Sequence, residues 1–149
     1  MMFLIKMHHM SLQEVKLIDL PKILDDRGNL SFFESNSQIP FEIKRVYWIY
    51  DVPGGEQRGG HAYHDLEEVV VALSGSFDVV LHDGNMEKTF TLNRSYYGLY
   101  IPKMIWRHIE NFSTNSLALI AADKAYNAEN YIRDFEFFRQ MKTNAAYRI

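Results

Sequence analysis

Short stretches rich in β-branched and aromatic residues recur from Phe41 onward, and glycine, proline or asparagine separates them. The stretches read KRVYWIYDV, EEVVVALSG, SFDVVLHDG, KTFTLN, GLYIPKMIWRHIENF and SLALIAA. Turn residues between short strands are typical of an antiparallel sandwich or barrel, whereas a parallel sheet needs helical segments between its strands. The sequence therefore predicts an all-β centre.

The connections carry their own signals. Asp83-Gly84 favours a tight hairpin turn, and Ser74-Gly75 is a weaker signal of the same kind. An earlier block, KLIDLPKILDDRGNLSFFES, predicts two more short strands around a turn at 26–29. One helix is expected in AENYIRDFEFFRQMK, after Asn127 as N-cap, because apolar residues recur there at steps of three and four. These residues are Tyr131, Ile132, Phe135, Phe138 and Met141.

Length and composition narrow the class of protein. A chain of 149 residues suits one ordinary domain, so a single domain over 1–149 is expected, with residues 1–10 as a disordered or extended tail and Met10 as a second possible start. The net charge of -3 creates no field that favours nucleic acid or an acidic membrane surface. No apolar run approaches the ~20 residues that span a bilayer. The absence of cysteine excludes disulfides and fits a cytoplasmic protein.

Alternation along the strands indicates where a ligand would bind. In RVYWIYD, period two places Arg45, Tyr47, Ile49 and Asp51 on one face, and the apolar Val46, Trp48 and Tyr50 on the other. The mixed polar face either meets solvent or lines a pocket. The same alternation puts His61 and Tyr63 on one face, and an inward polar row in a small barrel marks a ligand site.

Two spaced motifs resemble those of the cupin family. Gly55, five residues, His61-Ala62-Tyr63, four residues, Glu68, six residues and Gly75 follow the first cupin motif, with tyrosine in place of its second histidine. A later run resembles the second cupin motif, with methionine and arginine in place of its usual glycine and histidine. The residues at the motif positions are Pro102, Met104, Arg107 and Asn111.

The two replacements argue against a metal. A cupin metal site uses three histidines and a glutamate, and two of those histidines are Tyr63 and Arg107 here. Arginine keeps its positive charge and repels a divalent cation. His64 would point to the opposite face of its strand from His61. No metal is therefore expected.

More narrowly, the chain from about Val15 to Phe138 resembles the cupin family of sugar-nucleotide 3,4-ketoisomerases, which act on dTDP-4-keto-6-deoxy-D-glucose. The resemblance implies an RmlC-like jelly-roll barrel with a short C-terminal helix, a homodimer with exchanged N-terminal strands, no metal or organic cofactor, and a histidine base. It also implies a dTDP-3-keto-6-deoxyhexose product for an aminotransferase, in deoxysugar biosynthesis for lipopolysaccharide or O-antigen. The matching stretches are DDRGNLSFFE, IPFEIKRVYWIYDVPGGEQRGGHAY, ALSGSFDVVLHDG, YGLYIPKMIWRHIENFS and ENYIRDFEFF.

That reaction removes the C3 proton, passes through an enediol(ate) and returns a proton to C4, so it needs a base near neutrality and donors for oxyanion charge. His61 is the expected base. Tyr63 is an expected donor, or it orients the sugar, and Tyr47 is expected to touch the substrate. Glu68 is a lesser candidate for orienting His61.

The diphosphate of a sugar nucleotide is negatively charged, and so is this chain overall, so positively charged side chains are needed at the binding site. The planar guanidinium group of arginine suits phosphate oxygens. Four arginines are expected to bind it: Arg45, Arg58, Arg107 and, from the first turn, Arg27, which exchanged strands would bring to the partner subunit's site. By contrast His82 is expected to be solvent-exposed, and His108 to be structural.

Two alternatives stay open at this point. One is an epimerase acting on the same 4-keto sugar nucleotide, because abstraction of an acidic proton is the shared step. The other is a non-catalytic cupin that binds nucleotide sugars. The C4 configuration of the product, galacto or gluco, and the downstream sugar are not determined by the sequence.

Overall fold

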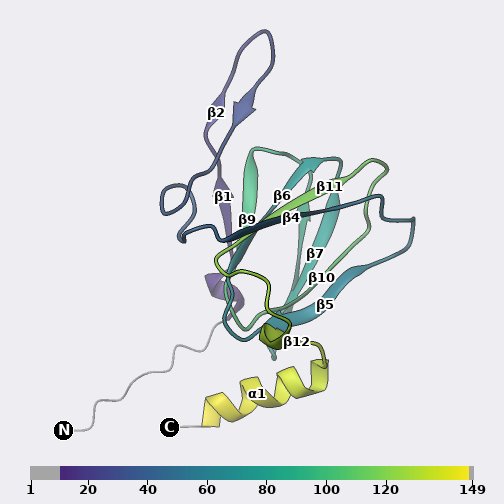
Figure 1. Ribbon diagram of the computed structural model, residues 1–149. Coiled ribbons are helices and arrows are strands. Elements are labelled where there is room, and N and C mark those ends of the chain that lie inside the picture. Colours follow the sequence, from purple (N-terminus) through teal and green to yellow (C-terminus); the bar gives the residue numbers. More distant parts are fainter. Residues whose placement is uncertain (1–10, 148–149) are drawn as a thin grey trace, which may run out of the picture.

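The computed structural model describes residues 11–147, and the expected tail at 1–10 lies outside the described residues (Figure 1). Two five-stranded sheets, antiparallel in every pairing, form its body. In sheet order, the first contains β1 (Lys16–Asp19), β9 (Tyr97–Ile101), β6 (Glu68–Ser74), β11 (Leu117–Ala122) and β4 (Arg45–Tyr50). The second contains β12 (Tyr131–Ile132), β5 (Arg58–Tyr63), β10 (Trp106–Glu110), β7 (Phe77–His82) and β8 (Glu87–Leu92). The predicted jelly-roll fold is confirmed.

The core lies between the two sheets. Strand β6 is buried on both sides: Val70 and Ala72 belong to the central cluster with Phe77 and Leu81 of β7, because alternate residues face inward. On its other face, Val69 and Val71 pack under residues of the incoming N-terminal segment. These covering residues are Leu20, Ile39 and Phe41.

Two of the predicted turns are confirmed and one is wrong. A hairpin of β2 (Lys22–Ile23) and β3 (Leu30–Ser31) projects from the body (Figure 1). Asp83-Gly84 joins the paired β7 and β8. Ser74-Gly75 makes no hairpin, because β6 and β7 belong to different sheets. Gly75 turns the chain between them at φ +67°, where a Cβ would lie 2.5 Å from the Ser113 hydroxyl oxygen.

The C-terminal helix is shorter than its apolar pattern predicts. Helix α1 spans Phe135–Tyr147, and the carboxylate of Asp134 caps it by accepting from the Phe137 amide at 2.7 Å. Asn127 caps a 3-10 helix instead, η2 (Ala128–Asn130), and a similar short helix, η1 (Leu12–Glu14), precedes β1.

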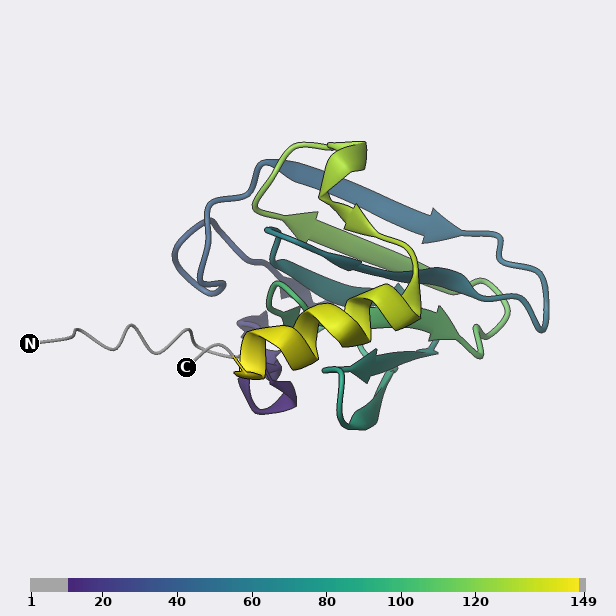
Figure 2. The same ribbon diagram turned by 90° about the horizontal axis from the view of Figure 1, so that it is seen from below.

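Residues Tyr131 and Ile132, assigned to the helix by their spacing, form the edge strand β12. Pairing with β5 satisfies their backbone, and Ile132 is buried with Ala62 and Phe138. Helix α1 then lies along the side of the barrel below β12 (Figure 2). Tertiary burial therefore overrides a weak helical periodicity here.

A β-bulge at the start of β5 aligns the two strands that carry the motif residues. His61 pairs with Arg107 of β10, but the next pair is Gly59 with His108, so Gly60 is the extra residue. Directly paired residues share a face of the sheet, and the bulge therefore turns His61 and Arg107 to the same side. Gly59 has φ +97°, and its missing Cβ would lie 3.1 Å from the Arg107 carbonyl oxygen.

We expect Gly59→Ala to lower the free energy of unfolding by about 1–3 kcal/mol, because it combines a left-handed backbone with this close approach. Gly60→Ala is the matched control, since Gly60 has φ +83° but nothing within 4 Å of a Cβ. Urea unfolding of both variants should show the larger loss at Gly59. Equal losses would contradict the role given to the close approach.

Candidate active site

A cavity of about 440 Å³ opens between the sheets, and we call it the barrel cavity. It brings together residues from β4, β5, β6, β10, β11 and the segment that contains β12. In β4, Arg45, Tyr47 and Ile49 of the mixed polar face line the cavity. The apolar Val46, Trp48 and Tyr50 of the other face are 46%, 57% and 61% exposed, and Trp48 also borders the cavity. Six of the seven predicted site residues line it: Arg45, Tyr47, Arg58, His61, Tyr63 and Arg107.

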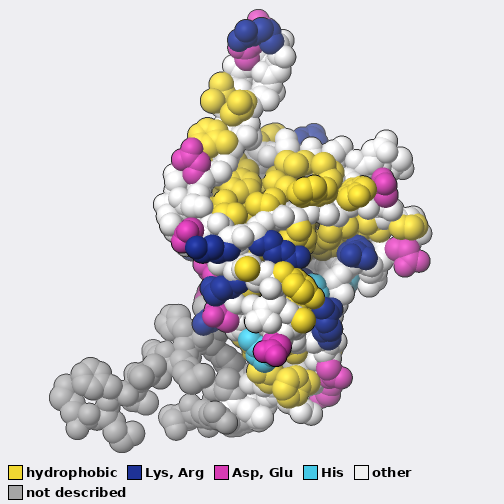
Figure 3. Space-filling model, viewed as in Figure 1, with side chains coloured by type: hydrophobic (Ala, Val, Ile, Leu, Met, Phe, Trp, Pro, Cys, Tyr) yellow, Lys and Arg dark blue, Asp and Glu magenta, His cyan; other side chains and the backbone are white. Residues whose placement is uncertain are grey.

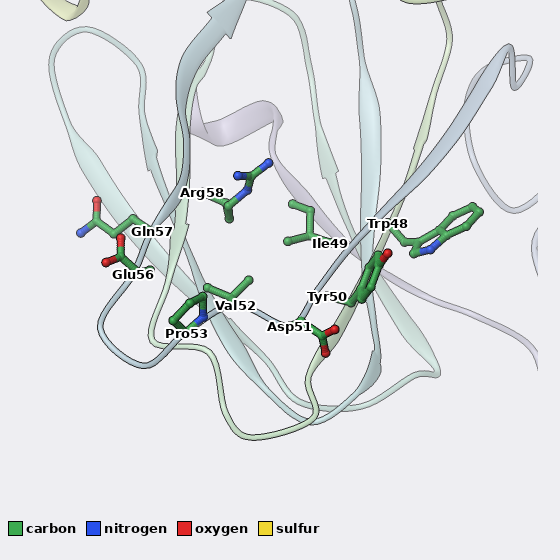
Figure 4. Close-up of a pocket in the computed structure, with 9 residues that line it drawn as sticks. All are labelled: Trp48, Ile49, Tyr50, Asp51, Val52, Pro53, Glu56, Gln57 and Arg58. Atoms are coloured by element: carbon green, nitrogen blue, oxygen red, sulfur yellow. The ribbon is translucent and has the colours of Figure 1, made fainter.

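A second cavity of about 450 Å³ adjoins the first at the β4–β5 connection, and we call it the loop cavity (Figure 4). The two cavities are neighbours, because they share four lining residues: Trp48, Ile49, Gln57 and Arg58. The remaining walls of the loop cavity come from the end of β4 and the loop after it: Tyr50, Asp51, Val52, Pro53 and Glu56. The arrangement suits an extended ligand that passes Arg58 on its way into the barrel.

A buried ion pair forms the floor of the barrel cavity. Arg107 and Glu68 are 3% and 2% exposed, and Arg107 Nη1 donates to Glu68 Oε1 at 2.5 Å. Arg107 Nη2 donates to the Ile105 carbonyl oxygen at 2.7 Å, and the Tyr47 hydroxyl donates to Glu68 Oε2 at 2.9 Å. Both oxygens of Glu68 thus accept from Arg107 and Tyr47, so the structure does not support Glu68 as the residue that orients His61.

The same pair bears on metal binding. Arg107 stands where a cupin ligand histidine would be, and its guanidinium group engages the one carboxylate of the motif. Within residues 11–147, no group of three or more His, Asp or Glu side chains is arranged to hold a metal ion. The donor set therefore does not fit a divalent cation.

His61 is a neutral imidazole in an apolar and positively charged setting. Burial, followed by the charges of Arg107 and Arg133, lowers the pKa of His61 from 6.5 to about 3. Its Nε2 atom is buried and has no hydrogen-bond partner among the described residues. Because His61 lines the barrel cavity, its neutral imidazole is a candidate to accept a proton from a molecule bound there.

The two phenols near His61 are held protonated. Tyr63 is 1% exposed, and burial, followed by the charge of Glu68, raises its pKa well above 10. Burial and Glu68 raise the pKa of Tyr47 in the same way. The Arg107 guanidinium lies over the Tyr63 ring at 4.8 Å. At neutral pH both groups are therefore hydrogen-bond donors rather than bases.

The arginines differ in their placement. Arg45 lies over the Tyr47 ring at 4.5 Å, and Arg58 is exposed where the two cavities meet. Arg27 is far from this arrangement: its side chain is 90% exposed in the β2–β3 connection and pairs with Asp25 at 2.8 Å. Within one chain, the structure does not bring Arg27 to the barrel cavity.

Several cavity residues were not predicted from the sequence, and two of them lie next to each other in the C-terminal segment. Tyr131 and Arg133 line the barrel cavity, and the Arg133 guanidinium lies 4.3 Å from the centre of the Tyr131 ring. The helical interpretation of this stretch concealed them. Their alternation with the apolar Ile132 is a period-two signal that could have found them.

The histidines outside the cavity have other partners. His82 is half-buried rather than solvent-exposed, since its Nδ1 accepts from the Gly84 amide and its ring packs on Phe135 at 5.0 Å. His108 contacts Glu110 at 3.2 Å, in agreement with a structural role. Glu67 contacts Tyr100 rather than the cavity, so Glu67 and Glu68 point apart as expected.

None of the helices in the described part of the chain is both long and apolar enough to cross a membrane.

A protein-family model described as "FdtA: WxcM-like, C-terminal" matches residues 13–143. The chain belongs to this family. Its FdtA-type domain therefore covers the barrel, both cavities and most of α1. The resemblance noted in the motifs is confirmed by this match.

Three relatives are isomerases by name. TDP-4-oxo-6-deoxy-alpha-D-glucose-3,4-oxoisomerase of Aneurinibacillus thermoaerophilus is 42% identical over 127 residues, which are 85% of this chain and 91% of the relative. The solved 3,4-ketoisomerase from Helicobacter canadensis is 41% identical, with a TM-score of 0.85 over 87% of this chain and 98% of that one. A mutant of the 3,4-ketoisomerase QdtA from Thermoanaerobacterium thermosaccharolyticum, in complex with TDP-4-keto-6-deoxyglucose, is 34% identical, with a TM-score of 0.87 over 90% and 97%.

Proposed function

We propose that this FdtA-family protein is a metal-independent sugar-nucleotide 3,4-ketoisomerase, which converts dTDP-4-keto-6-deoxy-D-glucose to a dTDP-3-keto-6-deoxyhexose. One observation carries the proposal: a neutral imidazole, that of His61, lines a cavity together with protonated phenols and arginines. The names of three relatives, two of them more than 40% identical, support the same activity.

In this mechanism His61 takes the proton from C3 of the 4-keto sugar, and the electron pair of the broken C–H bond forms the C3–C4 double bond of an enediolate. Charge then develops on the C4 oxygen, where the phenol of Tyr63 donates a hydrogen bond. Delivery of a proton to C4 returns His61 to its neutral form, and the proton of the C3 hydroxyl passes to the C4 oxygen. C3 then carries the carbonyl and C4 the hydroxyl. The reaction is an internal transfer, so no oxidant or reductant is consumed.

The diphosphate is proposed to lie against the arginines at the mouth of the barrel cavity. Arg45 and Arg58 line this region, and Arg133, from the segment after β12, adds a third charge. The sugar then reaches His61, and the nucleoside extends into the loop cavity past Arg58. Three local guanidinium groups offset two phosphate charges in a chain whose net charge is -3.

We also propose a homodimer with exchanged N-terminal strands. The β2–β3 hairpin projects from the body with Ile23, Leu24 and Leu30 more than half exposed, and the outer face of β4 exposes Trp48 and Tyr50. Figure 3 shows apolar side chains gathered on the body below this hairpin. A second copy would cover these surfaces and bring Arg27 near the partner's site. Sedimentation equilibrium of the full chain at micromolar concentration tests the dimer.

The decisive experiment is incubation with dTDP-4-keto-6-deoxyglucose in deuterated water, followed by proton NMR of the product. Ketone migration places deuterium at C4 and moves the carbonyl to C3. Epimerisation places deuterium at C3 or C5 and leaves the ketone at C4. Unchanged sugar at an enzyme concentration equal to that of the substrate would instead identify a binding protein. The product's C4 configuration is read from the same spectrum.

We also propose that the protein acts in the cytoplasm, and that its product is used to build a cell-surface amino sugar. Both proposals follow from the resemblance to the 3,4-ketoisomerases.

The lowered pKa of His61 predicts an unusual pH profile. The neutral imidazole is the active form, and its pKa of about 3 lies below the ordinary 6.5. We therefore expect kcat/KM to stay level as the pH falls from 7.5 to about 5, with the acid limb below that range. Arg133→Met should move this acid limb of the kcat/KM profile to higher pH, because the substitution removes a positive charge that disfavours the imidazolium form of His61.

Circular dichroism must accompany this profile. The folded protein binds a proton at His61 less readily than the unfolded chain, so the stability contributed by the neutral imidazole is lost as the pH falls below 6.5 toward 3. A limb near 6.5 in a protein that is still folded would contradict the lowered pKa of His61.

A further inference from the structure

The imidazole of His61 is held by aromatic rings. Its ring centre lies 4.9 Å from that of Tyr63, at an interplanar angle of 72°, and 5.0 Å from that of Tyr131, at 58°. Tyr63 and Tyr131 also contact each other at 4.8 Å and 62°. The three rings form a closed triangle, in which the two contacts of Tyr63 are edge-to-face and the His61–Tyr131 contact is tilted. No carboxylate among the described residues is hydrogen-bonded to His61 Nε2.

Tyr131 reaches this triangle from the C-terminal segment, and two independent contacts keep it there. Its strand pairs Tyr131 directly with Tyr63, and the neighbouring Ile132, 2% exposed, is buried in the cluster that anchors α1. The Tyr131 ring also contacts the Arg133 guanidinium at 4.3 Å and the Tyr126 ring at 5.9 Å. Tyr131 is therefore fixed before any ligand binds.

A catalytic histidine usually depends on a hydrogen bond to a third group for its orientation. Here the carboxylate best placed for that duty, Glu68, accepts from Arg107 and Tyr47 instead. Ring packing is left to set the direction of the imidazole and to exclude water from it.

We propose that Tyr131 is a positioning residue, whose ring directs the His61 imidazole into the barrel cavity and shields it from water. This inference rests on the proposed function. The phenolic hydroxyl has no part in this role. A misdirected base loses rate steeply, because a displacement of ~1 Å can cost about a hundredfold. We therefore expect Tyr131→Ala to lower kcat by roughly 10- to 100-fold with little change in KM, and Tyr131→Phe to keep near-normal kcat.

The test begins with NMR of the ligand-free protein, so that it does not depend on turnover. The His61 Cε1 proton is identified by its loss in His61→Asn, and its chemical shift is followed with pH. In the wild type and in Tyr131→Phe, ring currents should displace this signal, and it should not titrate between pH 5 and about 8. In Tyr131→Ala the displacement should shrink, and the signal should titrate toward the ordinary value of ~6.5 as water enters.

Two further variants keep the result interpretable. Tyr126→Ala removes a ring that contacts Tyr131 but has no ring contact with His61, and should leave the His61 titration as in the wild type. Tyr131→Leu keeps bulk in β12 in case the alanine variant does not fold, and should behave as the alanine variant does. An unchanged His61 signal in both Tyr131→Ala and Tyr131→Leu would overturn the proposal, as would a loss of kcat in Tyr131→Phe equal to that in Tyr131→Ala. Absence of turnover in the wild type would overturn the proposed function but not the NMR result.

Discussion

His61→Asn is expected to lower kcat by about 10²- to 10⁴-fold, the contribution of a positioned acid or base, while leaving the fold intact. Asparagine fills part of the same space but cannot accept the C3 proton. The fold should tolerate the change, because His61 Nε2 makes no hydrogen bond within residues 11–147 that the substitution would break. Product formation is followed by NMR at saturating dTDP-4-keto-6-deoxyglucose, with circular dichroism to check the fold.

His64→Asn is the matched control. His64 is three residues away and exposed, and it does not line the barrel cavity. This variant should turn over at the wild-type rate. The His61 variant should also fail to exchange the C3 proton of the substrate with deuterated water, which separates loss of the base from loss of a later step. Wild-type turnover in His61→Asn would remove His61 from the role of base.

Arg107→Met is expected to lower the free energy of unfolding by about 3–5 kcal/mol, because it leaves a buried carboxylate without its counter-charge. Glu68 is 2% exposed and accepts a hydrogen bond from Arg107 at 2.5 Å, so water cannot readily replace the lost donor. The Tyr47 hydroxyl alone would remain to stabilise the carboxylate. Urea unfolding at neutral pH measures the loss.

Two further variants test whether the loss comes from the buried charge of Glu68. One is a double variant, and the other is a control in an exposed ion pair. Combining Arg107→Met with Glu68→Gln removes both charges and should recover much of the lost stability, because a neutral amide needs no counter-charge. Arg27→Met breaks the exposed pair with Asp25 and should cost no more than about 1 kcal/mol. A loss at Arg107 as small as that at Arg27 would show that water reaches Glu68.

Several residues of the site could be predicted from local patterns in the sequence, namely strand alternation and motif spacing. The period of two in β4 separates Arg45 and Tyr47 from Trp48, and the motif spacing identifies His61, Tyr63 and Arg107 as neighbours in a barrel. Such predictions succeed because a strand alternates its faces whatever its surroundings. The alternation does not say which face is inside. In β4 the polar face lines the cavity, and the apolar face around Trp48 is exposed.

Other features depend on contacts between distant segments. Ser74-Gly75 resembles a hairpin turn locally, but the chain passes there from one sheet to the other. Tyr131 has helical spacing with its neighbours, but the free edge of β5 captures it as a strand. In both cases the local preference is worth less than the hydrogen bonds and burial supplied by a partner far along the chain.

The sequence by itself determined the all-β architecture, the family and the residues of the motif, because strand alternation, turn chemistry and motif spacing are local properties. Only the tertiary structure decided that Glu68 pairs with Arg107 instead of orienting His61, and that Tyr131 and Arg133 complete the cavity. Those contacts join residues 39 positions apart in the first case, and β5 to the C-terminal segment in the second. Such pairings depend on how the two sheets and the edge strand close around the barrel, which no local pattern encodes.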